Sequence, residues 1–150
     1  MVQKLRERSQ GEGGFTLVEL LVVMLILGLL AAIAIPSFFN QRDKARDADA
    51  KAAVRTAQTA METYATDNGN DGYLNADAAA LLAIEETLND ADLQEPTVTD
   101  DTYTVTVDSS TEENTFSIAR AANGQVTLSC TTPTVGTAND GCRADGTWGD

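Results

Sequence analysis

The hydrophobic pattern of the chain changes sharply at residue 15, where a short polar stretch gives way to a long apolar run. Residues 15–39 contain a single charged side chain, that of Glu19. At 1.5 Å of rise per residue, a helix of this length measures about 37 Å. The hydrocarbon core of a bilayer is roughly 30 Å thick, so the run predicts a membrane-spanning helix with some tilt.

Beyond Pro36 the apolar positions recur at intervals of three and four residues, which predicts that the helix continues to about Thr66. One face of this second half is expected to pack on a core, and its residues are Ala50, Val54, Ala57, Met61 and Tyr64. Turn-forming residues at 67–69 and 71–72 then end the helix.

A shorter helix is predicted from about Asp77 to Asn89, as a lid or connector. Its apolar residues Leu81, Ile84 and Leu88 fall on one face, and Pro96 marks a later break.

Alternating apolar and polar residues predict three half-buried strands in the last third of the chain. The apolar positions are Tyr103, Val105 and Val107, then Phe116 and Ile118, then Val126, Leu128 and Cys130. Three such strands fit an antiparallel meander. The chain is therefore predicted to be an α+β protein, in which a long N-terminal helix packs on a small antiparallel sheet of three or four strands.

The turn between the last two strands fixes their register. A two-residue Asn123-Gly124 loop would turn Phe116 and Ile118 away from the core. A three-residue loop of residues 122–124, with Gly124 left-handed, instead places Ile118 opposite Leu128 and Phe116 opposite Cys130. All apolar positions then face the helix, so we predict the three-residue loop.

Composition makes the chain strongly acidic and limits it to one modest core after the apolar run. There are 23 acidic and 10 basic residues, for a net charge of −13. The 111 residues after Phe39 are too few for two comfortable domains. Such a surface repels nucleic acid, so no direct nucleic-acid binding is expected.

The charges are unevenly placed along the chain. Five basic residues cluster after the apolar run, whereas residues 57–150 hold 17 acids and two arginines. This asymmetry favours head-to-side packing between copies. Solvation of a helix face explains the cluster equally well, because acids are interleaved with it and Asp47 can pair with Lys51. The five basic residues are Arg42, Lys44, Arg46, Lys51 and Arg55.

The residue types give little support for catalysis, metal binding or a cofactor. The chain has no histidine and only two cysteines, so the usual bases, redox motifs and zinc ligand sets are missing. The stretch 67–72 superficially resembles the start of a calcium-binding loop. Counted from Asp67, however, the third and twelfth loop positions are Gly69 and Ala78, which offer no side-chain oxygen. We predict no enzyme, no metal site and no cofactor.

The N-terminal end of the apolar run admits two interpretations. Basic residues at 4, 6 and 8 hold that end in the cytoplasm. A secretory signal cleaved after Ala34, at Ala32-Ile33-Ala34, would release a secreted acidic binding domain. Against this, the apolar stretch exceeds the usual 7 to 15 residues, carries Glu19 and follows a Gly-Phe junction.

The segment Gly14-Phe15-Thr16-Leu17-Val18-Glu19-Leu20-Leu21, with Gly28 and Pro36 further along, resembles the class III signal and N-terminal helix of type IV pilins. The resemblance runs from Gly14 to about Phe39, and pseudopilins share the same stretch. It implies a pilin-like fold, with residues 1–14 as a cytoplasmic leader, 15–39 as a transmembrane and assembly helix, and 40–150 as a globular head.

The resemblance also implies how the chain is processed and assembled. A prepilin peptidase cuts after Gly14 and methylates the new amine of Phe15, leaving a mature net charge of −14. Glu19, together with Thr16, then serves assembly, because the carboxylate of one subunit neutralises the amine of a neighbour in an apolar filament core. Gly28 and Pro36 are expected to loosen or kink the helix, since proline lacks an amide hydrogen and crowds the preceding turn.

Cys130 and Cys142 are expected to form a disulfide if the head lies outside the cytoplasm, where oxidation is favoured. Their placement resembles the C-terminal disulfide loop of many pilins. Two free buried thiols are the alternative.

The resemblance implies a major-type structural subunit of a type IV pilus, which polymerises with copies of itself through an inner-membrane assembly platform. The precursor would be a single-pass membrane protein with its head outside, and the product a surface filament for adhesion, motility or DNA uptake. A pseudopilin of a type II secretion system is the main alternative. It is disfavoured by the Cys130 to Cys142 loop, which many such pseudopilins lack. The secreted acidic binding domain is the third.

Overall fold

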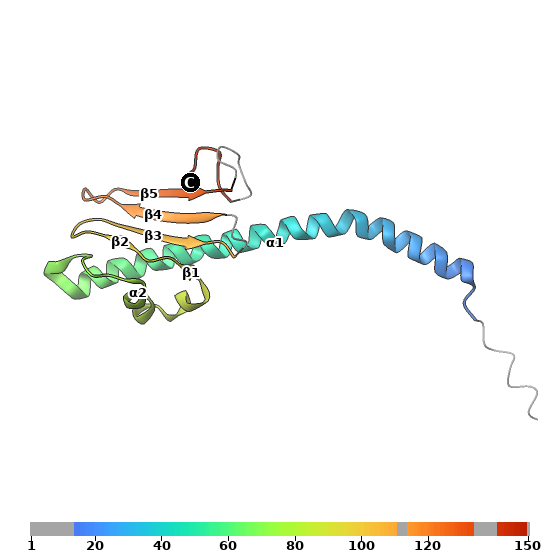
Figure 1. The fold of residues 1–150 in the computed structure, drawn as a ribbon, viewed down its shortest axis with the longest axis horizontal. Coiled ribbons are helices and arrows are strands. Elements are labelled where there is room, and N and C mark those ends of the chain that lie inside the picture. Colours follow the sequence, from blue (N-terminus) through green and yellow to red (C-terminus); the bar gives the residue numbers. More distant parts are fainter. Residues whose placement is uncertain (1–13, 111–113, 134–140, 150) are drawn as a thin grey trace, which may run out of the picture. The chain divides into compact units, whose positions relative to one another are not determined.

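The computed structural model describes residues 14–110, 114–133 and 141–149. The chain divides into two compact units, Met1–Phe39 and Asn40–Asp150. In the described part of the chain, the first unit consists of residues 14–16 and the start of a helix, and the second combines helix with an antiparallel sheet (Figure 1). The α+β architecture predicted from the sequence is confirmed.

Helix α1 (Leu17–Asn68) is continuous through both Gly28 and Pro36, so neither residue ends it. Its C-terminal end lies two residues beyond the predicted one. There the 3₁₀ turn η2 (Gly69–Asp71) follows, and Gly72 adopts a positive φ of 53°. A Cβ at Gly72 would lie 2.1 Å from the carbonyl oxygen of Asp100. Glycine is therefore required at this turn by both its backbone conformation and its close contact.

The sheet contains the three predicted strands and two very short ones. β3 (Tyr103–Asp108), β4 (Thr115–Arg120) and β5 (Val126–Thr131) form an antiparallel meander. β1 (Asp92–Leu93) and β2 (Thr97–Val98) both pair with the free edge of β3. The sheet is therefore four strand positions wide. Two-residue strands carry no alternation that a sequence pattern can reveal, which explains why β1 and β2 were not predicted.

The turn between β4 and β5 has the predicted three-residue form. Ile118 pairs with Leu128 and Phe116 with Cys130, and Gly124 has a φ of 82°. Val126 shares the face of Leu128 and Cys130 and pairs with Arg120, but at the start of β5 it stays 38% exposed.

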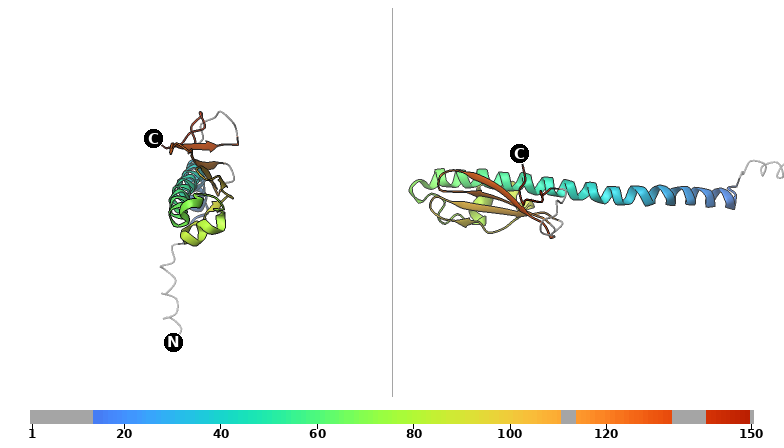
Figure 2. Two further views of the ribbon diagram at one scale, coloured as in Figure 1. Left: turned by 90° about the vertical axis from the view of Figure 1, so that its left-hand side faces the viewer. Right: turned by 90° about the horizontal axis from the view of Figure 1, so that it is seen from above.

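The core lies between α1 and one face of the sheet (Figures 1 and 2). Alternate residues of β3 and β4 are buried, as strands with one solvated face require. The predicted stripe on α1 is confirmed, except that Tyr64 is only partly buried. The buried residues contributed by α1 and the three long strands are Ala50, Val54, Ala57, Ala60, Met61, Tyr103, Val105, Val107, Phe116, Ile118 and Cys130.

The predicted helix at 77–89 is two elements. Helix α2 (Ala78–Ile84) starts after Asp77, whose carboxylate accepts a hydrogen bond from the backbone N–H of Ala80 at 2.7 Å. The 3₁₀ helix η3 (Glu86–Asp90) follows. Glu85 breaks the run because its backbone is extended and its carboxylate accepts a hydrogen bond from the Thr87 hydroxyl at 2.8 Å. Leu81 and Leu88 are buried as predicted, but Ile84 is 37% exposed.

A polar cluster joins α1 to the sheet around the carboxylate of Glu62. The hydroxyls of Tyr73 and Tyr103 donate to its two oxygens at 2.8 and 2.7 Å. The Nε of Arg120 lies 3.4 Å from the same carboxylate. Burial, reinforced by the hydrogen bond to Glu62, raises the pKa of Tyr73 to about 12. The same two causes raise the pKa of Tyr103.

These raised pKa values predict that the head loses stability in alkali. An unfolded tyrosine ionises near pH 10, whereas Tyr73 holds its proton to about pH 12. The stabilisation is therefore fully present below pH 10, falls as the unfolded state loses protons, and is gone above the folded pKa. Denaturant unfolding followed by circular dichroism from pH 8 to 12 should show this decline. Tyr73→Phe should make it shallower, and an equally steep decline in that variant would contradict the assignment.

Candidate functional site

Thr16 caps the start of α1 and places Glu19 in its first turn. The Thr16 hydroxyl accepts a hydrogen bond from the backbone N–H of Glu19 at 3.2 Å, and the Thr16 carbonyl accepts one from the N–H of Leu20. A threonine cap followed three residues later by glutamate is the pattern of a capping box. The positive end of the helix dipole also favours a carboxylate here. The two residues assigned to assembly are thus brought together.

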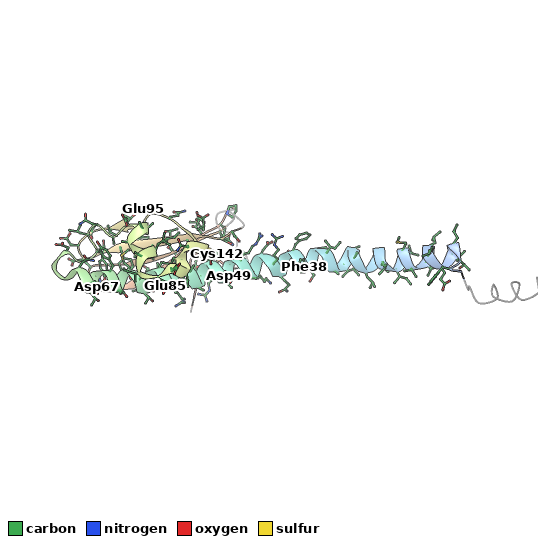
Figure 3. The ribbon with its side chains drawn as sticks, turned by 90° about the horizontal axis from the view of Figure 1, so that it is seen from below. Phe38, Asp49, Asp67, Glu85, Glu95 and Cys142 are labelled. Carbon is green, nitrogen blue, oxygen red and sulfur yellow. A yellow bond between two sulfur atoms is a disulfide. The ribbon has the colours of Figure 1, made fainter. Side chains whose placement is uncertain are left out.

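The apolar run presents a bare hydrophobic surface. Every large apolar side chain from Phe15 to Phe39 is at least 45% exposed, and Leu17 reaches 77%. Figure 3 shows Phe38 among the side chains projecting from this part of α1. The helix is long and apolar enough to cross a membrane. An apolar surface this extensive indicates contact with lipid or with other protein.

Two glycines of this segment are not required by the fold of the single chain. A Cβ added at Gly14 or Gly28 would meet no atom within 4 Å. Glycine inside an exposed helix costs about 1 kcal/mol relative to alanine. The reason for Gly28 therefore lies outside the isolated chain. Gly14 and Phe15 lie exposed before the helix, and cleavage between them and methylation of Phe15 stay predictions. Residues 1–13 of the predicted leader peptide lie outside the described residues.

The predicted disulfide is present between Cys130 and Cys142. Cys130 ends the buried pattern of β5, and its N–H donates to the carbonyl of Gly146 at 2.8 Å. Ser129 and Thr147 form a β-bridge. Residues 141–149, which we call the C-terminal strap, therefore return along β5 after the second cysteine.

Trp148 in the strap is a core residue that the sequence pattern did not reveal. Only 4% of it is exposed, and its Nε1 donates to the carbonyl of Ser117 at 3.3 Å. Its ring packs edge-on against Phe116 with centroids 5.8 Å apart. The Arg55 guanidinium lies 5.1 Å from its centroid. The available clue was that the chain has one tryptophan, and large aromatic residues are usually buried.

Asp47 has a structural role that differs from its expected pairing with Lys51. It is buried, and its carboxylate accepts a hydrogen bond from the Asn114 side-chain amide at 2.7 Å. Lys51 instead lies over the Phe116 ring, 5.1 Å from the centroid. A Cβ at Gly141 would come within 2.6 Å of an Asp47 oxygen. Asp47 therefore ties α1 to the start of β4 and lies close against Gly141 of the strap.

Comparison with known proteins gives two family matches along the chain. The family described as type IV minor pilin ComP, DNA uptake sequence receptor, matches residues 36–143. The prokaryotic N-terminal methylation motif matches residues 10–35. Together they cover both the apolar segment and most of the head.

Individual relatives come from pili and from secretion systems. The chain is 39% identical over 57 residues to the type II secretion system core protein G of Pseudomonas aeruginosa, covering 38% of this chain and 40% of the relative. It is 41% identical over 51 residues to the type IV major pilin protein PilA of Myxococcus xanthus, covering 34% of this chain and 23% of the relative. It is 37% identical over 71 residues to the type IV wide pilus major component PilA4 of Thermus thermophilus, covering 47% of this chain and 52% of the relative.

The chain thus spans about a quarter to a half of the length of these curated relatives. No solved structure gives a significant match.

The disulfide and Trp148 together generate a stability prediction. Cys130→Ser combined with Cys142→Ser should lower the free energy of unfolding by about 3 kcal/mol, because the unfolded chain regains the entropy of the closed loop. Trp148 is the sole tryptophan, so its emission reports directly on release of the strap. Emission should shift to longer wavelength at lower denaturant concentration than in the parent chain. Thr127→Ser, at an exposed position of β5, is the control. An unchanged unfolding midpoint in the double cysteine variant would refute the prediction.

Proposed function

Because the chain belongs to the type IV pilin family, we propose that it is the major-type structural subunit of a type IV pilus. Pilin-family proteins assemble into pilus or pseudopilus polymers, and the N-terminal methylation motif implies processing by a prepilin peptidase. The observation that carries the proposal is an exposed apolar helix that follows the Gly14-Phe15 junction, is capped by Thr16 and carries Glu19 in its first turn.

In the proposed pathway the chain first enters the membrane as a single-pass precursor with its head outside the cytoplasm. The peptidase removes residues 1–14 and methylates the amine of Phe15. The apolar segment 15–39 serves the precursor as a membrane anchor and the polymer as its core. Lipid tails and neighbouring helices both cover the apolar side chains that the single chain leaves exposed.

Glu19 sets the offset between neighbouring subunits in this proposal. Cleavage leaves a positive amine at Phe15, and the Thr16 cap holds the Glu19 backbone within one turn of it. Each charge alone is costly in an apolar filament core. Pairing the carboxylate of one subunit with the amine of its neighbour removes both penalties, so the matching offset is strongly preferred.

Gly28 and Pro36 would matter in the polymer, since the single chain forms a continuous helix through both. Proline removes one backbone hydrogen bond and glycine lowers helix stability. We propose that the helix loosens between them when subunits pack, and that neighbouring chains satisfy the freed groups.

A pseudopilin of a type II secretion system is the second candidate, and the likeness to core protein G favours it. The minor-pilin match over 36–143 and the disulfide loop support the pilus instead. Purified surface filaments that contain this chain as their abundant subunit would favour the pilus. Short assemblies confined to the cell envelope would favour the pseudopilus.

The matched family is described as a receptor for DNA uptake sequences, but we do not propose that this head binds DNA directly. Residues 40–150 contain 20 acidic and seven basic residues. A surface of that charge repels the phosphate backbone, on which DNA affinity depends. Adhesion, motility or DNA capture would belong to the polymer and its other subunits.

The role of Glu19 predicts a selective loss of assembly. Glu19→Gln and Glu19→Leu should leave the precursor in the membrane with its disulfide intact and reduce sheared surface filaments by at least about tenfold, one unpaired buried charge being worth well over 1.4 kcal/mol. Asp71→Asn, at an exposed site in the head, should assemble normally. Quantitative immunoblots of filament and membrane fractions measure both pools. Normal filament yield from both Glu19 variants would show that the acid is incidental.

Gly14 allows a separate test of processing. Gly14→Val meets no steric barrier in the fold, so any defect reports on recognition by the peptidase. The variant precursor should accumulate uncleaved, whereas Gly28→Ala should still be cut. Intact-mass analysis of membrane extracts distinguishes the two forms. A mature chain starting at Phe15 from Gly14→Val would overturn the assignment of the cleavage site.

A further inference from the structure

The head carries opposite charge on two flanks of α1. Lys44, Lys51 and Arg55 are spaced by seven and four residues, which places them on one side of the helix. Lys51 lies over Phe116 of β4 and Arg55 over Trp148 of the strap. We call these three residues the positive flank; it lies on the side of α1 toward β4 and the strap. Contact with an aromatic face leaves their charge intact.

A group of six acidic residues lies on the other side of α1. Helix α2, η3 and β1 together form what we call the negative flank, and Figure 1 shows α2 and β5 on opposite sides of α1. Residues 77–95 contain six acids and no base, and all but Glu85 are exposed. Figure 3 views this flank and labels Glu85 and Glu95. The six acids are Asp77, Glu85, Glu86, Asp90, Asp92 and Glu95.

The negative flank is also hollowed. A groove of about 550 Å³ runs between α1, η3, β1 and β3, with Ala50, Ala53 and Val107 among its apolar lining residues. Its charged lining residues are four aspartates and Arg46, so the groove is net negative. Two of these aspartates, Asp92 and Asp108, stand directly opposite each other on paired strands. Like charges in that position repel. The Gln94 amide donates to both Asp108 oxygens at 2.9 and 2.7 Å, and a cation from a neighbouring copy would offset the repulsion further.

From this complementarity we propose that the positive flank of one copy docks on the negative flank of the next. The inference rests on the proposed polymerisation and specifies the contact between heads. The two surfaces differ and lie on opposite sides of one head, so the contact is heterologous and each copy offers a free surface for another. Contacts of this kind that do not close into a ring generate open helical filaments. Charge complementarity then sets which faces meet.

This contact also explains how strongly acidic heads can pack at all. The head has a net charge of −13 over residues 40–150, and most pairs of surfaces on two copies would repel. The positive flank is where α1 offers cations to a neighbour. Because Lys44, Arg55 and five of the six acids are exposed, the contact should weaken with salt over the range in which screening shortens to about 10 Å or less.

Three charge variants of the whole chain test the proposal. The first reverses the positive flank with Lys44→Glu, Lys51→Glu and Arg55→Glu. The second reverses the negative flank with Glu86→Lys, Asp90→Lys and Asp92→Lys. The third carries both sets and so restores complementarity with the polarity exchanged. A matched control reverses Asp67, Asp71 and Asp100, which belong to neither flank.

Each single-flank variant should yield at least about fivefold fewer filaments than the parent chain, and the combined variant should recover to within about twofold. The control should assemble normally. Raising NaCl should dissociate parent filaments, and Mg²⁺ at equal ionic strength should do no better at holding them together. Filaments unaffected by either single reversal, or a combined variant no better than the singles, would overturn the proposal. Assembly that depends on Mg²⁺ would do the same, by assigning the acids to metal bridging.

Folding is monitored in every variant through the disulfide and Trp148 emission, because Lys51 and Arg55 contact the core. If their reversal unfolds the head, Lys44→Glu alone and the negative-flank variant still decide the matter. Absence of filaments from the parent chain would refute the proposed function itself. If the parent chain forms filaments and reversing either flank leaves the filament yield unchanged, only this docking contact is refuted.

Discussion

The rest of the structure depends on an apolar helix that the described residues of its own chain leave uncovered. Side chains from Phe15 to Phe39 lie open to solvent, and burying each of them is worth roughly 1.5–3 kcal/mol. In the proposed function, lipid covers this segment before assembly and neighbouring helices cover it afterwards. Within such surroundings one carboxylate has a large effect, because an unpaired charge is penalised and a paired one is not. In the proposed assembly, Glu19 would turn this non-directional attraction into a contact with one preferred offset.

The head is built to hold the second half of α1 firmly against a small sheet. Three contacts act at different points along the helix: Asp47 accepts a hydrogen bond from Asn114, Arg55 lies over Trp148 of the strap, and Glu62 accepts hydrogen bonds from two tyrosines. The disulfide closes the strap onto β5. Few large side chains fill the core, so these cross-links supply order that a larger domain would obtain from burial alone.

Local patterns predicted much of this fold, and tertiary contacts account for what they missed. The end of α1 and the register of β4 with β5 follow from periodicity and from the turn at Gly124, and both are confirmed. Of the candidate site, the Gly14-Phe15 junction and Glu19 were identified from the sequence. The structure adds that Thr16, three residues before Glu19, caps the helix. Trp148 was missed because a lone aromatic residue in a tail has no period, and Asp47 was given Lys51 as its partner because its contact with Asn114 is made across the fold. Glu85 ends α2 through a side-chain hydrogen bond that propensity does not encode.

The most direct test of the central claim is a helical reconstruction of the native filaments by electron cryomicroscopy at side-chain resolution. The account predicts a mature chain beginning at Phe15, with the Glu19 carboxylate of each subunit within hydrogen-bonding distance of the Phe15 amine of a neighbour. A filament in which Glu19 faces solvent, pairs within its own chain, or lies apart from every amine would contradict it.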